Sequence, residues 1–174
     1  MVIIQKAAEG VSGTMLARFL ARARRELKLD GGVTLLVASS AQLRRLNRDF
    51  RGRDYPTDVL SFPAETPPQH RPKQPSRFTP ARYAGDIAVS VDIAQQNGRK
   101  LGHGTTVEIK TLIVHGLLHL AGYDHEHDNG RMARQELRLR GTLGLAEGLI
   151  ARAELGRLPA KSKCAPAARR SKPR

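Results

Sequence analysis

Three histidines in the last third of the chain have the side-chain type and the spacing of ligands to one metal ion. They lie in the segment HGLLHLAGYDH as His115, His119 and His125. Residues four apart on an α-helix lie on the same face, so His115 and His119 can share an ion. Gly122 can end that helix in a left-handed conformation and let the chain turn back, which brings His125 to the same face. The pattern predicts a single zinc ion with three imidazole ligands.

Zinc with three protein ligands has the chemistry of a catalytic site. The fourth tetrahedral position stays open to water, whose pKa falls to about 7 when it is bound. A lone histidine on an apolar helix is more often a core residue than a ligand. Three at these spacings are harder to explain in that way, because each unpartnered buried polar group costs about 1–3 kcal/mol. The histidines therefore favour a metal-dependent hydrolase.

The neighbours of the histidines narrow the kind of hydrolase. In the metalloprotease pattern H-E-x-x-H the residue after the first histidine is the glutamate that activates water, whereas this chain has Gly116 there. A zinc peptidase is therefore disfavoured. His127 is an alternative third ligand if the turn is longer, and Asp124 is a candidate acceptor for an imidazole N–H behind the metal.

The composition fits one domain with an aliphatic core. The 174 residues are 40% hydrophobic and 26% charged, with 4% aromatic residues and no Trp, and this length suits one core better than two. The one cysteine, Cys164, allows no internal disulfide. No stretch has the length and apolarity of a signal peptide or a membrane span. We therefore expect a cytoplasmic protein without a membrane partner.

The charge of the chain favours a polyanionic partner. The formal net charge is +14, and residues 157–174 contribute half of it with seven Lys or Arg and no acid. The rest of the chain is still basic, which suits a nucleic-acid surface, although a merely solvated basic surface is the alternative. The low aromatic content predicts recognition of backbone and shape rather than base stacking.

Hydrophobic periodicity predicts an α/β (α+β) fold in which a small mixed sheet packs against helices. Strands are predicted at 2–4, 33–37, 59–62 and 87–91, and helices at 14–27, 40–50, 91–96, 105–120 and 130–150. The helix at 105–120 is apolar on nearly all sides and should be buried, with Thr105 or Thr106 as its cap. Gly98 is expected to stop the third helix, and Gly141 or Gly144 to interrupt the last.

One domain is predicted over residues 1–156, followed by a basic disordered tail at 157–174. Residues 64–82 hold five of the ten prolines and almost no aliphatic residues, which predicts an exposed loop inside the domain. The tail consists mainly of Pro, Lys, Ser, Arg and Ala, a composition that cannot form a core.

Three motifs in order resemble the YbeY family of bacterial endoribonucleases and rRNA maturation factors. They are NRDFRGRDYPTDVLSFP at 47–63, GDIAVS at 85–90 and HGLLHLAGYDH at 115–125. The resemblance runs from about residue 33 to residue 150. It implies a single domain with a zincin-like metal-site helix, and hydrolysis of RNA phosphodiesters.

The resemblance also implies roles for particular residues and partners. His115, His119 and His125 would hold one zinc ion, and His115 would be catalytic as well. The family's functional arginine, which follows an aromatic residue before the segment P-T-[ND]-V-L-S-F-P, corresponds to Arg51. Its planar fork of donors can hold a scissile phosphate, although an arginine judged without the family is more often simply solvated.

The activity implied by the resemblance is that of a single-strand-specific endoribonuclease. It would act on an rRNA precursor at the 3′ end of 16S rRNA and in ribosome quality control. Its partners would be the small ribosomal subunit and a small-subunit ribosomal protein. Attack by water and attack by the 2′-hydroxyl of the RNA both remain open as routes.

Some features depart from the family pattern. The loop at 64–82 is longer and richer in proline, fewer acids follow His125, and the basic tail is an addition. A second hypothesis is a non-catalytic ribosome assembly factor with a structural zinc site. Asp58, Ser61 and Asp86 are expected to have structural roles at the strands rather than roles in the chemistry.

Overall fold

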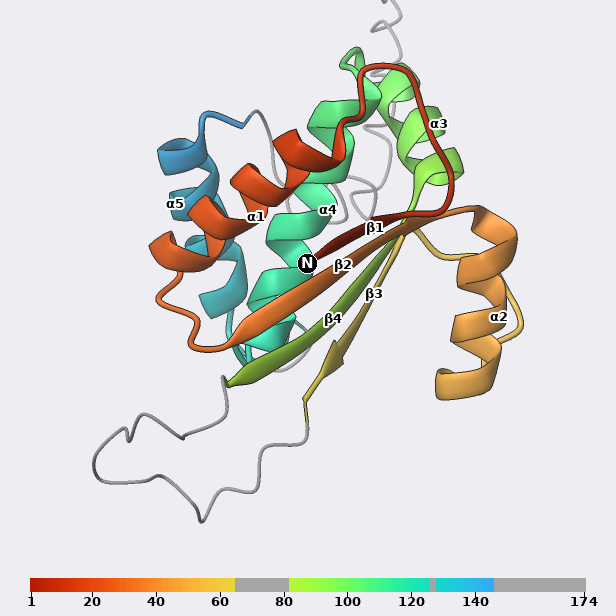
Figure 1. Cartoon of the computed structure of the whole chain (residues 1–174). Helices are drawn as coiled ribbons and strands as arrows, with labels where there is room; N and C mark the ends of the chain where they lie inside the picture. The colour runs from red at the N-terminus through yellow and green to blue at the C-terminus, as the bar shows by residue number, and fades with distance from the viewer. Residues whose placement is uncertain (65–81, 126–127, 146–174) are drawn as a thin grey trace, which may run out of the picture.

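The computed structural model describes residues 1–64, 82–125 and 128–145. Within these ranges the chain forms a four-stranded mixed sheet and five helices, as the sequence predicts. The elements, in chain order, are β1 (Val2–Ile4), α1 (Gly13–Glu26), β2 (Gly32–Ala38), α2 (Ser40–Arg51), β3 (Val59–Pro63), β4 (Tyr83–Ser90), α3 (Val91–Leu101), α4 (Thr105–Leu120) and α5 (Arg131–Leu143) (Figure 1).

The sheet has the strand order β1-β2-β4-β3, with β1, β2 and β4 parallel and β3 antiparallel to β4. β3 is an edge strand and ends at Pro63, which has no N–H to donate and is tolerated there. Pro63 pairs with Gly85, whose φ is 139°. A Cβ atom at Gly85 would lie 2.2 Å from the carbonyl oxygen of Phe62, so only glycine fits between the two strands.

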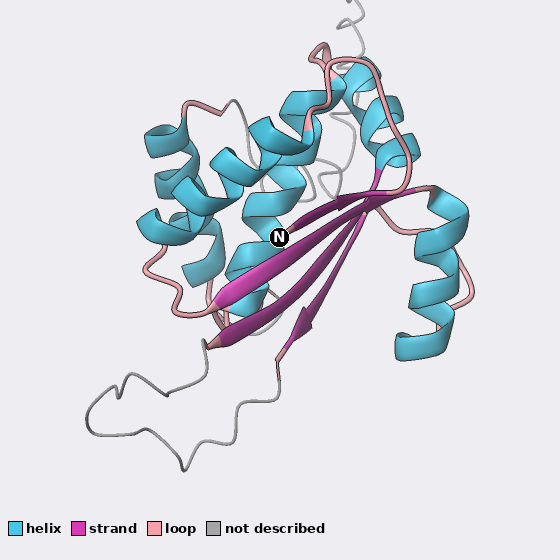
Figure 2. Cartoon of the chain, in the orientation of Figure 1, coloured by secondary structure: helices cyan, strands magenta, loops and turns pink. Residues whose placement is uncertain are grey.

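Helices cover the two faces of the sheet unequally. α1, α4 and α5 lie on one face and α2 on the other (Figure 2). β2 alternates accordingly, since Leu35 and Val37 belong to the larger core while Leu36 and Ala38 pack on the α2 side with Leu43. The main core therefore lies between the sheet and α4.

α4 is the buried centre of the fold, as its apolar sequence predicts. It contacts β3, β4, α1, α3 and α5, and eleven of its residues are buried. Its closest approach to the sheet is at Gly116, where a Cβ atom would lie 2.9 Å from Cγ2 of Ile87 and 3.1 Å from Oγ of Ser61. Among the described residues no helix, α4 included, is long and apolar enough to cross a bilayer.

Several predicted boundaries are wrong. β4 begins at Tyr83 instead of residue 87, because its first residues pair with β2 from Gly32 onward. α3 continues through Gly98 and ends at Leu101, before Gly102 in a left-handed conformation. Gly98 instead allows the backbone of His103 to pack closely against α3, since a Cβ atom at this position would lie 2.8 Å from the carbonyl oxygen of His103.

The cap of α4 also differs from the prediction, whereas α5 ends at one of the two expected glycines. The N-cap of α4 is Gly104, without a side-chain hydrogen bond, and Thr106 donates its hydroxyl to the carbonyl of Gly10 at 2.9 Å instead. α5 passes through Gly141 and ends before Gly144. The predicted loop at 64–82, apart from its two end residues, the tail at 157–174 and the end of the last predicted helix lie outside the described residues.

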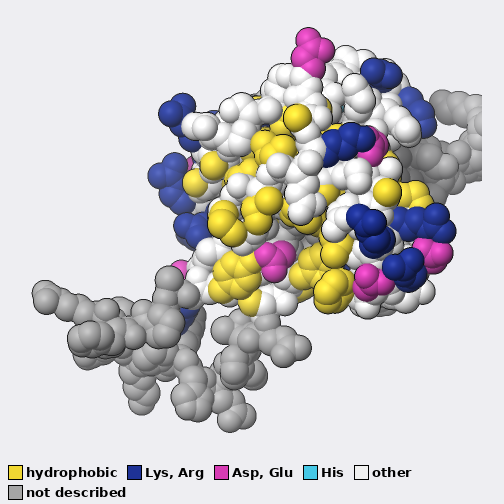
Figure 3. Space-filling model, turned by 45° about the vertical axis from the view of Figure 1, so that its right-hand side comes forward, with side chains coloured by type: hydrophobic (Ala, Val, Ile, Leu, Met, Phe, Trp, Pro, Cys, Tyr) yellow, Lys and Arg dark blue, Asp and Glu magenta, His cyan; other side chains and the backbone are white. Residues whose placement is uncertain are grey.

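Part of the sheet face beside α2 is left open as an apolar groove. Its lining includes Ile3, Leu36, Leu46, Phe50 and Phe62, and the rings of Phe50 and Phe62 meet edge to face at 5.3 Å. Hydrophobic side chains gather near the middle of the view in Figure 3, with Lys and Arg toward its margins. This groove lies on the opposite face of the sheet from α4.

The tight contact at Gly116 gives a first testable expectation. Gly116→Ala should destabilise the protein by about 1–3 kcal/mol, because the added methyl group overlaps Ile87 and Ser61. Gly141→Ala is the matched control, since a Cβ atom at that α5 position meets nothing within 4 Å. It should stabilise by about 0.5–1 kcal/mol through helix propensity. Urea unfolding measures both changes, and a Gly116→Ala variant as stable as the parent would contradict this account.

Candidate metal centre

The three predicted histidines converge. His115 and His119 project from one face of α4, with their Nε2 atoms 3.1 Å apart, and the ring centroids of His125 and these two lie 5.6 and 5.5 Å apart. One ligand atom from each lies within 4.8 Å of the others, so the group can hold a metal ion. Nitrogens bound tetrahedrally at about 2.0–2.1 Å would be roughly 3.3 Å apart. The 3.1 Å between the Nε2 atoms of His115 and His119 fits this value, whereas separations of up to 4.8 Å within the group would have to shorten.

A glycine-dependent turn brings His125 to the helix. The N–H of Gly122 donates to the carbonyl of His119 and the N–H of Tyr123 to that of Leu118, both at 3.0 Å. Gly122 has a φ of 84°. These bonds and this conformation are a Schellman motif, which satisfies the last carbonyls of α4 and reverses the chain. The turn predicted from the sequence is confirmed.

Burial of the centre decreases from one ligand to the next. His115 is 7% exposed, His119 is partly buried and His125 is exposed. The cluster therefore has a closed side against the core and an open side toward solvent. A ligand or substrate can approach from the side of His125.

The environment of His119 keeps its imidazole neutral. Burial lowers the pKa of His119 from 6.5 to about 4, and the neighbouring His115 and His125 act in the same direction. A hydrogen bond with the backbone of Tyr123 and the charge of Asp124 oppose this shift. A neutral imidazole is the form that binds a metal ion, so at neutral pH this ligand needs no deprotonation.

A buried acid on α5 faces the closed side of the centre. Glu136 is 2% exposed, and its Oε1 lies 3.8 Å from Nδ1 of His115. The sequence analysis missed this residue. Its helical spacing could have revealed it, because Glu136 lies four residues after Met132 and three before Leu139, on the buried face of α5.

Arg51 is linked to α4 by two hydrogen bonds that meet at Ser61. It is the last residue of α2, and its Nη2 donates a long hydrogen bond of 3.5 Å to the carbonyl of Ser61. The hydroxyl of Ser61 in turn donates to the carbonyl of Gly116 at 3.3 Å. β3 therefore connects Arg51 to the residue that follows His115.

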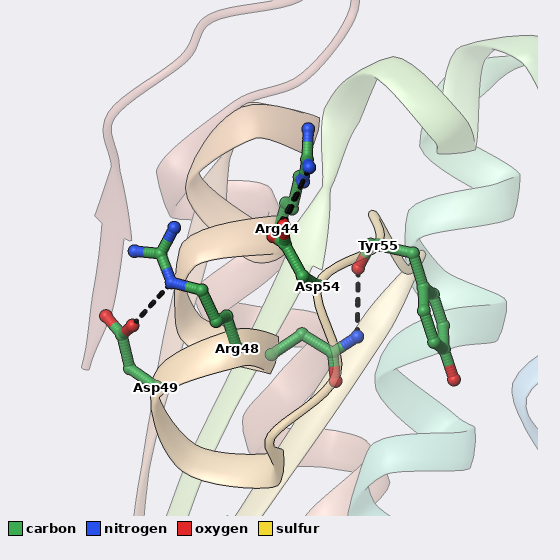
Figure 4. Close-up of polar contacts among 6 residues, drawn as sticks. Arg44, Arg48, Asp49, Asp54 and Tyr55 are labelled. Atoms are coloured by element: carbon green, nitrogen blue, oxygen red, sulfur yellow. Dashed lines mark hydrogen bonds and ion pairs between the residues drawn. The ribbon is translucent and has the colours of Figure 1, made fainter.

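Polar contacts fix the segment after α2. Asn47 is only 2% exposed, and its Nδ2 donates to the carbonyl of Tyr55 at 2.9 Å. Arg44 and Asp54 face each other in a two-point ion pair, both distances 2.8 Å (Figure 4). That pair is exposed and contributes little energy, so the buried amide of Asn47 is the firmer constraint. It holds the turn between α2 and β3, and with it the end of α2.

Asp58, Ser61 and Asp86 do not share one role. Oδ1 of Asp58 accepts from the N–H of Val59 at 2.8 Å, which is local backbone support. Asp86 accepts from the hydroxyl of Tyr83 and lines the groove on the far face of the sheet. Ser61 alone contacts the metal-site helix. His127, the alternative ligand, lies outside the described residues.

Fold and centre together define the chain as an α/β protein with a three-histidine site able to hold a metal ion. Comparison with known proteins narrows this class, since the family described as Endoribonuclease YbeY matches residues 5–143. An endoribonuclease YbeY of Koribacter versatilis is 46% identical over 152 residues, which cover 87% of this chain and 91% of the relative. The chain belongs to the endoribonuclease YbeY family, a family of hydrolases that act on RNA.

Other comparisons give a consistent picture. An endoribonuclease YbeY of Solibacter usitatus is 40% identical over 153 residues, covering 88% of this chain and 94% of the relative. The solution structure of TM1509 from Thermotoga maritima covers 94% of this chain and 100% of its own at 24% identity. Its TM-score of 0.48 is too low to bear on the fold or the function.

The lowered pKa of His119 implies a pH-dependent stability. In the unfolded chain this imidazole takes up a proton near pH 6.5, but in the folded chain only near pH 4. Protons therefore favour the unfolded state, and the free energy of unfolding of the metal-free protein should fall as the pH drops from about 6.5 toward 4. Urea unfolding across this range measures the slope.

His119→Gln is the control for that measurement. The variant lacks the titrating group, so its stability should depend less on pH in the same window. Equal slopes for the parent and the variant would mean that His119 is not held neutral by the fold.

Proposed function

We propose that this protein is a zinc-dependent, single-strand-specific endoribonuclease that matures and monitors ribosomal RNA. The observation that carries the proposal is the convergence of His115, His119 and His125 within ligand distance. Arg51 is linked to the helix of the first two through Ser61. Membership of the family indicates the reaction, which is cleavage of RNA. The three histidines and Arg51 are the residues that we propose carry it out.

Zinc is the ion that suits this donor set. Three imidazoles without a thiolate or a carboxylate are typical of zinc sites, and the fourth position is then free for water or substrate. Nε2 of His115 lies 3.1 Å from Nε2 of His119, so these two nitrogens are placed to share an ion. A zinc ion bound here would supply Lewis acidity and a water acidic enough to ionise near neutral pH.

The chain's own residues would orient the RNA and stabilise its charge. The guanidinium of Arg51 is planar and permanently charged, and can donate two parallel hydrogen bonds to a phosphate. A hydrogen bond to the carbonyl of Ser61 holds it at β3, the strand that contacts α4. From there it would stabilise the negative charge that grows on the phosphate in the transition state. His115 anchors the metal side of the site. A 2′,3′-cyclic phosphate on the product would identify the 2′-hydroxyl as nucleophile, and its absence would identify water.

The substrate we propose is an rRNA precursor, cut at the 3′ end of 16S rRNA. A net charge of +14 supports a polyanionic substrate, and few aromatic residues favour contacts with the backbone. Selection of the cleavage site would then come from the small ribosomal subunit and one of its proteins. The catalytic domain would comprise residues 1–156 in the cytoplasm, with 157–174 as an added basic tail.

The alternative of a non-catalytic assembly factor is less well supported. A structural zinc site is closed by a fourth protein ligand, whereas the candidate ligand group within the described ranges has three members, one of them exposed to solvent. The curated relatives are also named as nucleases.

Metal content and RNA cleavage together test the proposal. The purified protein should carry about one zinc ion per chain and cut a structured rRNA fragment, whereas His115→Ala and His119→Ala should lose both properties. His103→Ala is the matched control, because His103 lies outside the ligand group and should keep both. Equal cleavage by the parent and the ligand variants would assign the activity to a contaminating nuclease.

Arg51→Lys separates the arginine from the metal. Lysine keeps the charge but loses the paired donors, so cleavage should slow on the order of 10²-fold while zinc content stays unchanged. Arg53→Lys, two residues along in the same exposed segment, should change the rate little. A similar loss in both variants would point to general electrostatics and away from a specific phosphate contact.

A further inference from the structure

The two ring nitrogens of His115 face different surroundings. Nε2 lies 3.1 Å from Nε2 of His119 and is therefore the atom directed at a shared metal ion. Nδ1 is buried and has no hydrogen bond within the described part of the chain. The carboxylate of Glu136 faces this nitrogen, with its Oε1 3.8 Å away.

The position of Glu136 is costly for a carboxylate. It is 2% exposed on a helix face formed by Met132, Leu139 and Leu143, where an acid is less stable than an apolar residue unless it has partners. Arg140 follows it by one turn and is also 2% exposed. α5 thus carries two buried charged residues one turn apart, of which Glu136 faces His115.

We infer that Glu136 positions His115 for metal binding by accepting a hydrogen bond from its Nδ1–H. The inference rests on the zinc site proposed above. A distance of 3.8 Å is longer than a hydrogen bond, so the two side chains would have to approach each other by roughly 0.6 Å. The proton would then be fixed on Nδ1, leaving the lone pair on Nε2 for the ion.

A carboxylate behind a histidine ligand acts on the metal through the ring. It fixes the tautomer and the ring orientation and makes the other nitrogen a stronger donor, and losing such a partner typically weakens metal binding 10- to 100-fold. His119 has the backbone of Tyr123 beside it, which acts to raise its pKa. Glu136 would therefore orient His115 from the side opposite the ion.

The test measures zinc affinity by chelator competition for the full chain and for two variants. Glu136→Leu keeps the volume and removes the acceptor, so zinc should bind about 10- to 100-fold more weakly. Glu136→Gln keeps a carbonyl acceptor without the charge, so its affinity should fall between those of the parent and the leucine variant. Cobalt absorption spectra should shift in the same order, because the ligand field depends on the orientation of His115.

Glu108→Gln is the matched control. Glu108 is 0% exposed and its Oε2 lies 3.2 Å from Nε2 of His103, a histidine outside the metal centre. This substitution also removes a buried carboxylate that faces a histidine, but that histidine does not belong to the metal centre. Zinc affinity and the cobalt spectrum should therefore not change. Thermal unfolding of the metal-free proteins shows which variants fold.

The outcomes separate the two proposals. If the parent binds no zinc, the zinc-dependent function fails and this inference fails with it. If the parent binds zinc and the folded Glu136 variants bind it equally well with the same cobalt spectrum, Glu136 has only a structural role. Should Glu136→Leu not fold, Glu136→Gln decides alone, supported by nitrogen NMR of the His115 ring, whose Nδ1–H tautomer should lose population in that variant.

Discussion

The close approach of α4 to the sheet at Gly116 is the contact on which the rest of the site depends. Ile87 and Ser61 fill the space that a side chain at this position would need. His115 precedes Gly116, so its height above the sheet is set by this contact. Ser61 also accepts from Arg51, so the same strand sets the distance between α2 and α4. Because protein interiors are densely packed and compress little, these distances are held firmly.

Local rules account for what the sequence predicted correctly. The spacing of His115 and His119 follows from the helix repeat alone, and the turn at Gly122 from the preference of glycine for left-handed conformations. The buried state of α4 follows from its apolar circumference. Each of these features depends on residues within one or two turns of each other. Arg51 did not follow from such rules, and only the family resemblance marked it.

Contacts between distant segments account for what the sequence did not predict. The early start of β4 depends on pairing with β2. The continuation of α3 through Gly98 depends on the close approach of the backbone at His103. Ser61 contacts Gly116, which is 55 residues away in the chain, and Glu136 faces His115, which is 21 residues away. An acid on an otherwise apolar helix face could have been noticed, but the histidine it faces is visible only in three dimensions.

The turn after α4 gives the metal centre an uneven rigidity. Two ligands stand on a helix locked into the core, while His125 stands on an exposed segment that is held by the bonds of the Schellman motif. Such a segment can open without unfolding the domain, because little apolar surface is exposed when it does. With the ion held as we propose, its exchange with solvent would be governed by the opening of these few residues. The lifetime of the bound ion and the lifetime of the fold would then be independent quantities.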